Sequence, residues 1–192
     1  MNRRRIVYAA AGLVGLCLAA LLLSNLLSAP PITVTTGKGA VTTGKGAAMT
    51  GRGFTVRIPK AWTAVSLPSP KTDIVLLAKD QQAAGPITPG LIIRRTPADF
   101  FSIDKDMPGL IMANQFQHPA VTVQRREHVI VSGAKEAVIL VSEYVESGVH
   151  ERILDIVART PSNVAYHLQA VAPREMLTDI TISAILESFT VS

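Results

Sequence analysis

The feature that most constrains this chain is an uncharged apolar run near its N-terminus. Residues 6–27, IVYAAAGLVGLCLAALLLSNLL, follow three consecutive arginines and contain no charged side chain. As a helix this run extends about 33 Å at about 1.5 Å per residue, enough to cross the roughly 30 Å hydrocarbon core of a bilayer. Arginines on the short flank predict a cytoplasmic N-terminus. We therefore expect residues 1–28 to form one transmembrane anchor in the cell membrane and the rest of the chain to be extracytoplasmic.

Two alternatives to a permanent anchor stay open. Cleavage of a signal peptide after Ala29 would release a secreted protein, but Leu27 stands where a signal peptidase prefers a small residue. Pro30 would then be the first mature residue, which disfavours cleavage. The only cysteine, Cys17, is a candidate for lipid attachment, although a largely apolar sequence follows it. No disulfide can form within a chain that has one cysteine, so the domain depends on packing.

A short repeat separates the apolar run from the remainder. VTTGKGA occurs at residues 34–40 and again at 41–47. Across the repeat, GAVTTGKG (39–46) has the glycine spacing of a phosphate-binding loop, but Gly46 stands where that motif needs Ser or Thr to reach Mg²⁺. No apolar periodicity predicts a helix after it. We interpret residues 29–52 as a flexible Gly/Thr/Lys linker and expect no nucleotide to bind.

The basic charge of the chain belongs to its N-terminal part. The whole sequence carries 19 Lys and Arg against 14 Asp and Glu. Three of the basic residues precede the apolar run and three lie in the linker, so the remainder has 13 basic and 14 acidic residues. A nearly neutral domain lacks the electrostatic footprint of nucleic-acid recognition. We expect no nucleic-acid partner.

Residues 53–192 change from strand to helix patterns and back. Short alternating runs predict strands at 54–58, 73–80 and 91–96. After Pro97, helical spacing takes over, with Pro108 expected in the first turn of the helix. The apolar residues on the helical spacing are Leu110, Ile111, Met112 and Phe116.

The second half predicts an antiparallel meander. Four strand-like runs, at 120–131, 135–145, 151–160 and 164–173, are separated by three short turns. A final amphipathic helix is predicted to pack on the sheet. Its apolar stripe consists of Met176, Leu177, Ile180, Ala184, Ile185 and Phe189. The order of strands, helix, four strands and helix indicates the α+β class.

Three segments carry a resemblance to a known family. GFTVRIPKAW, VIVSGAKEAVILVSEYV and AYHLQAVAPREMLTDITISAILESF resemble the PsbP-like superfamily, which includes DcrB-type and LpqN-type bacterial envelope proteins. The resemblance covers most of residues 53–192. It implies an antiparallel β-sheet flanked by helices, a PsbP-like α/β/α sandwich, that serves as a non-enzymatic binding or assembly module. It supplies no catalytic residues to carry over.

Local motifs for catalysis or metal binding are missing from the sequence. The four histidines, His118, His128, His150 and His167, lie outside H-x-x-x-H and H-E-x-x-H spacings, and no G-x-S-x-G occurs. Two acidic groups, Glu143, Glu146 and Glu151 in one and Asp99, Asp104 and Asp106 in the other, are interpreted as solvated surfaces. We expect no catalytic residues, no metal and no cofactor.

Two arginine doublets are the candidate contacts for a ligand. Arg94 and Arg95 lie in one predicted strand, and Arg125 and Arg126 lie in another. Neighbours in a strand point to opposite faces, so each doublet sends one arginine to each face. If the two strands are close together, these arginines form a contact for an anionic ligand or a partner.

The sequence as a whole predicts a membrane-anchored, extracytoplasmic, non-catalytic binding or assembly domain of the bacterial cell envelope. Its expected partner is an envelope protein or a lipid. The alternative is a membrane-bound extracytoplasmic hydrolase whose active site is dispersed along the sequence.

Overall fold

The computed structural model describes residues 47–65, 73–80, 88–98 and 103–192. The helices and strands within them are β1 (Ala48–Gly51), β2 (Phe54–Arg57), β3 (Trp62–Ala64), β4 (Ile74–Asp80), β5 (Gly90–Pro97), α2 (Ile103–Gln117), β6 (Thr122–His128), β7 (Glu136–Glu146), β8 (Val149–Arg159), β9 (Val164–Pro173), α3 (Asp179–Ser188) and β10 (Thr190–Val191).

The described strands form two sheets. Seven make an antiparallel sheet in the order β3-β4-β5-β9-β8-β7-β6, and the other three make a small sheet in the order β1-β2-β10. The predicted meander is confirmed, because β6, β7, β8 and β9 are consecutive antiparallel neighbours. The β7–β8 turn consists of Ser147 and Gly148, with φ values of 53° and 80°. Two residues in this left-handed region are what a type I′ hairpin turn needs.

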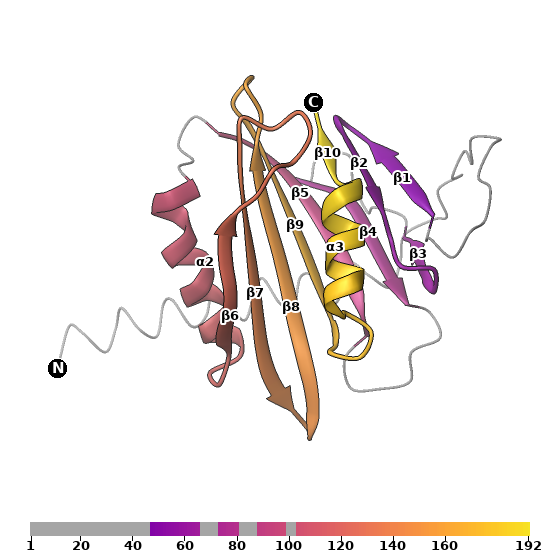
Figure 1. The fold of residues 1–192 in the computed structure, drawn as a ribbon, viewed down its shortest axis with the longest axis vertical. Coiled ribbons are helices and arrows are strands. Elements are labelled where there is room, and N and C mark those ends of the chain that lie inside the picture. Colours follow the sequence, from indigo (N-terminus) through magenta and orange to yellow (C-terminus); the bar gives the residue numbers. More distant parts are fainter. Residues whose placement is uncertain (1–46, 66–72, 81–87, 99–102) are drawn as a thin grey trace, which may run out of the picture.

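Helices cover the large sheet on both faces, which explains the nearly continuous apolar sequence of β7. Ala137, Ile139 and Val141 face the larger core, which α3 and the small sheet cover. Val138 points the other way, into a smaller core under α2. In Figure 1, α3 lies in front of the sheet and α2 lies beside β6 at the left. The predicted α+β class, an antiparallel sheet flanked by helices, is confirmed.

The buried face of α2 differs from the predicted one. Ile103, Met107 and Leu110 contact the sheet, whereas the side chains of Met112 and Phe116 are 67% and 71% exposed. At about 100° per residue, nine residues place Phe116 about 180° from Met107 around the helix. The prediction of an apolar stripe through Met112 and Phe116 is therefore wrong. Both side chains lie on the solvent face.

Helix α3 is shorter than the predicted amphipathic segment. The side chain of Thr178 accepts a hydrogen bond from the Thr181 N–H and so caps the helix, which begins at Asp179. Its buried residues are Ile182 and Ile185, and Ile180 is 83% exposed. The predicted stripe is therefore correct at Leu177, Ile185 and Phe189, which are buried, and wrong at Ile180 and Ala184, which are exposed.

The predicted linker ends earlier than residue 52. Residues 48–51 form β1, in which Met49 pairs with Val56 and Thr50 with Thr55 of β2. The prediction is wrong for these residues because their backbone N–H and C=O groups find ladder partners on β2. A Gly/Thr composition does not reveal this short hairpin, in which only residues 52 and 53 separate the paired strands.

The predicted membrane anchor, residues 6–27, and the GAVTTGKG segment lie outside the described residues. Within the part of the chain that the structure describes, no helix has the length and apolar character needed to cross a bilayer.

Candidate functional site

The two arginine doublets are not brought together. Arg94 and Arg95 lie in β5, and Arg125 and Arg126 lie in β6 at the edge of the sheet. Strands β9, β8 and β7 stand between them, so at about 4.8 Å per strand the doublets are about 19 Å apart. The two strands that carry the doublets are therefore not close together, so the four arginines do not form one joint ligand site.

Two of these arginines also have internal partners. The Arg95 Nε donates a hydrogen bond to the Tyr166 hydroxyl at 3.2 Å, and its guanidinium lies 6.0 Å from the centroid of the same ring. Arg125 is paired with Glu127 on its own strand. These contacts position the side chains within the fold and leave fewer donors for an anionic ligand.

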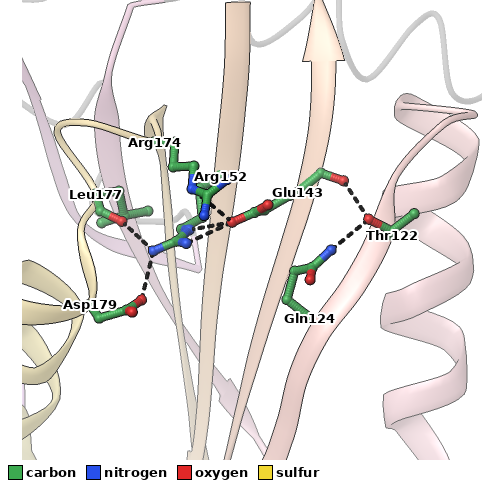
Figure 2. A network of polar contacts seen from close by, with 7 residues as sticks. All are labelled: Thr122, Gln124, Glu143, Arg152, Arg174, Leu177 and Asp179. Atoms are coloured by element: carbon green, nitrogen blue, oxygen red, sulfur yellow. Dashed lines mark hydrogen bonds and ion pairs between the residues drawn. The ribbon is translucent and has the colours of Figure 1, made fainter.

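A buried guanidinium joins β7, β8 and the start of α3 (Figure 2). Arg152 donates from Nε and Nη2 to the Glu143 Oε1, at 2.9 and 2.6 Å. Its Nη1 donates to the Leu177 carbonyl at 3.0 Å and to the Asp179 Oδ1 at 2.8 Å. Because the guanidinium is fully engaged with these neighbours, we interpret this network as a structural tie between α3 and the sheet.

A second polar cluster ties α2 to the opposite face of the sheet. Asp155 is completely buried. Its carboxylate accepts hydrogen bonds from the Asn114 Nδ2 of α2 and the Gln169 Nε2 of β9, each at 3.0 Å. The His167 Nε2 lies 2.8 Å from the Asp155 Oδ1. Asn114 therefore occupies the buried face of α2 because it satisfies this carboxylate.

The third polar cluster borders an open depression of about 310 Å³ at the C-terminal end of α2. Its lining residues come from the turn after α2 and from the end of β7: Gln117, His118, Pro119, Ala120, Tyr144, Val145 and Glu146. The turn is fixed by backbone hydrogen bonds from the His118 N–H to the Asn114 carbonyl and from the Val121 N–H to the His118 carbonyl. The His118 and Tyr144 rings stack with their centroids 3.8 Å apart.

Two neighbouring buried polar groups lack a partner, and one of them, Tyr144, lines the depression. Tyr144 and Glu151 stand directly opposite each other on β7 and β8 and are 5% and 2% exposed. Within the described part of the chain, the Tyr144 hydroxyl and the Glu151 Oε2 have no hydrogen-bond partner. A buried polar atom without a partner costs about 1–3 kcal/mol. Such a pair calls for an explanation, and a missing ligand group is one.

Burial and acidic neighbours shift the titration of this cluster. Burial raises the pKa of Glu151, and Glu175 and Glu146 raise it further. The Tyr144 pKa is likewise raised by burial and then by Glu151 and Glu146. Burial lowers the pKa of His118, against the opposing effect of Glu146. The lowered pKa disfavours the charged form of the His118 ring.

Exposed apolar side chains lie on the two elements that border the depression. Met112 and Phe116 are exposed on α2, and Val145 is exposed at the end of β7. We call the set Met112, Phe116, His118, Tyr144, Val145 and Glu146 the α2-end surface. It combines exposed apolar area with one exposed carboxylate, that of Glu146.

Sequence reasoning treated Glu143, Glu146 and Glu151 as one solvated group, and the structure separates them. Glu143 is paired with Arg152, Glu146 is exposed at the depression, and Glu151 is buried. The two-residue turn at Ser147–Gly148 is the sequence feature that could have predicted this separation. It fixes the hairpin register and so places Tyr144 opposite Glu151. The other acidic group, Asp99, Asp104 and Asp106, lies outside the described residues and side chains.

Comparison with known proteins identifies the fold. The solution structure of the cyanobacterial PsbP protein CyanoP, from Synechocystis, aligns with 82% of this chain and 99% of its own, at 12% identity and a TM-score of 0.58. The crystal structure of LpqN, a Mycobacterium tuberculosis protein involved in cell envelope biogenesis, aligns with 77% of this chain and 85% of its own, at 17% identity and a TM-score of 0.50. No family model and no curated protein matches the sequence. The fold is PsbP-like, which confirms the resemblance seen in the sequence.

Proposed function

We propose that this chain is a membrane-anchored, extracytoplasmic, non-catalytic binding domain of the cell envelope, and that its partner docks on the α2-end surface. The observation that carries the proposal is the buried Tyr144 and Glu151 pair without hydrogen-bond partners beside an open depression. The polar clusters around Arg152 and Asp155 are engaged internally and hold the fold together. At the α2-end surface the Tyr144 hydroxyl has no hydrogen-bond partner among the described residues, so this surface is the better candidate for intermolecular contact.

The exposed apolar residues supply the area that a contact needs. Met112 and Phe116 stand one helical turn apart on the solvent face of α2, so they form one exposed apolar ridge on that helix. Aromatic residues and methionine are enriched at the centres of protein interfaces. This composition supports docking of a partner.

Charge favours a protein over a membrane surface as the partner. Glu146 is exposed within the apolar set, and the pKa of the nearby Glu151 is raised first by burial and then by Glu175 and Glu146. Anionic lipids repel such a surface, whereas they attract basic segments. The envelope location is supported by the predicted anchor at residues 6–27 and by the shared fold of LpqN, a protein of envelope biogenesis.

Site-specific photo-crosslinking in intact cells tests this proposal. A benzophenone amino acid replaces Phe116 in the full-length chain, and a matched control replaces Glu187, which is exposed on α3. We expect the probe at 116 to form an adduct with one envelope protein that the probe at 187 does not form. Met112→Ser should weaken this adduct. Equal labelling from both positions, or an adduct with lipid alone, would contradict protein docking at the α2-end surface.

One observation favours the alternative function, a hydrolase. A buried carboxylate, Asp155, orients the partly exposed His167, as in hydrolytic sites where a base is held by a third group. Among the described residues, no hydroxyl or thiol is hydrogen-bonded to His167. Hydrolysis of ester or amide envelope substrates by the full chain, lost in His167→Gln with folding retained, would favour the hydrolase over the binding domain.

A further inference from the structure

We propose that Met112 is an oxidation site through which peroxides regulate docking at the α2-end surface. This inference rests on the proposed function and adds a chemical control to the same surface. The reaction converts the apolar thioether of Met112 into a polar sulfoxide. A polar group within an apolar contact weakens that contact, so oxidation releases the docked partner or prevents its return.

Exposure distinguishes Met112 from the other methionines in the described part of the chain. Met112 is 67% exposed, whereas Met107, five residues earlier on the same helix, is 1% exposed and packs in the smaller core under α2. Met49 and Met176 are partly buried against the larger core. A dissolved peroxide reaches an exposed thioether directly, but it reaches a buried one only when the fold opens locally. Among the described methionines, Met112 therefore reacts first.

The oxidation needs only a peroxide as co-reactant. A lone pair of the methionine sulfur attacks one peroxide oxygen, so that an S–O bond forms and the O–O bond breaks. The sulfur loses two electrons, and with hydrogen peroxide the second oxygen leaves as hydroxide and takes a proton to give water. Methionine sulfoxide reductases, one for each sulfoxide epimer, return the product to methionine. The modification is therefore reversible.

The position of Met112 explains why its oxidation affects docking. Met112 and Phe116 are neighbours on the exposed face of α2, four residues apart. The methionine side chain contributes to contacts through a flexible, polarizable thioether. A sulfoxide that is buried against a partner without a hydrogen bond loses its hydration, which costs binding free energy. A docked partner also covers the sulfur, so docking and oxidation exclude each other.

Peroxide treatment of the full-length chain in peroxide-free, non-ionic detergent tests the oxidation site. Met107 and Met112 lie in one tryptic peptide, residues 106–125, so the fragment ions of tandem mass spectrometry compare them within a single molecule. We expect the sulfoxide to form at least about tenfold faster at Met112 than at Met107, because the buried sulfur waits for local opening. Equal rates at the two positions would overturn the inference, whether or not a partner docks.

The effect on docking is measured with the photo-crosslinking probe at position 116. Brief exposure of intact cells to hydrogen peroxide should reduce the adduct several-fold. Met112→Leu removes the sulfur but keeps an apolar side chain of similar size, so its adduct should persist after peroxide. The matched control, Met176→Leu, should stay sensitive.

Two outcomes of the cell experiment would overturn regulation by Met112. One is an adduct that persists although mass spectrometry shows Met112 oxidised, and the other is an equal loss of adduct in Met112→Leu. Absence of the adduct before peroxide is added would instead contradict the proposed function. The comparison of Met107 with Met112 in the purified chain would still decide the oxidation site in that case.

Discussion

At the scale of single residues, Glu151 is the group whose environment departs most from what its sequence position suggests. A glutamate three residues after a Ser-Gly turn is ordinarily solvated. Here it is buried opposite Tyr144, and burial raises its pKa above the ordinary value of 4.5. The folded state therefore binds this proton more tightly than the unfolded state does.

This difference predicts how stability depends on pH. The stabilising contribution of protonated Glu151 is fully present below its unfolded pKa and is lost as the pH rises through the higher folded pKa. The Glu151→Gln variant should lack this loss, so its free energy of unfolding should fall less than that of the wild-type protein as the pH rises above 4.5. Urea unfolding across a pH series, followed by the fluorescence of the single buried Trp62, measures it.

The control for this prediction is Glu187→Gln, which removes an exposed carboxyl from α3. Its stability should follow the wild-type pH dependence. Parallel curves for Glu151→Gln and the wild type would show that the Glu151 carboxyl is solvated in the folded state. Glu146 and Glu175, which also face this carboxyl, remain in every variant and contribute equally to each curve.

At the scale of elements, α2 shows how a helix with a weak apolar pattern is oriented by its partners. Ile103, Met107 and Leu110 pack against the sheet, and Asn114 continues that face because it bonds to Asp155. Asn114 on the buried face, and Met112 and Phe116 on the solvent face, obscure the apolar periodicity of this helix in the sequence. The helix could be predicted from the sequence, but its rotation could not.

The orientation of α2 predicts opposite effects for two of its residues. Met107→Ala removes buried volume and should lower the free energy of unfolding by about 2–5 kcal/mol. Phe116→Ser changes an exposed side chain and should alter it by no more than about 0.5 kcal/mol. Urea unfolding of the full chain, again through Trp62, compares the two. A larger loss for Phe116→Ser than for Met107→Ala would mean that the helix presents its other face to the sheet.

At the scale of the whole molecule, the proposed function depends on where the domain resides. We propose that residues 1–28 anchor the chain with the domain outside the cytoplasm. A C-terminal alkaline phosphatase fusion, active only after export, should therefore be active in cells and fractionate with membranes. Deleting residues 1–28 should abolish that activity because the domain then stays in the cytosol. Activity of a cytosolic reporter at the same C-terminus would contradict the proposed location.

The order of strands in the large sheet keeps the two arginine doublets apart. Arg94 and Arg126 are both in strands, as predicted, but the chain forms β3, β4 and β5 side by side and then crosses to the far edge of the large sheet at β6 through α2. The meander returns to pair β9 with β5, so three strands come to lie between the doublets. The local sequence pattern predicted which segments form strands. The order of those strands in the sheet depended instead on how the two halves of the chain pair with each other.

The sequence by itself determined the class of fold, the meander and its hairpin turns, because these depend on side-chain alternation and backbone preferences of near neighbours. Only the tertiary structure decided which face of α2 is exposed and that Glu151 is buried beside Tyr144. It also separated Glu143, which is paired with Arg152, from Glu146 at the depression. These properties arise from contacts between residues far apart in the chain, where burial and charge pairing follow from packing rather than from local composition.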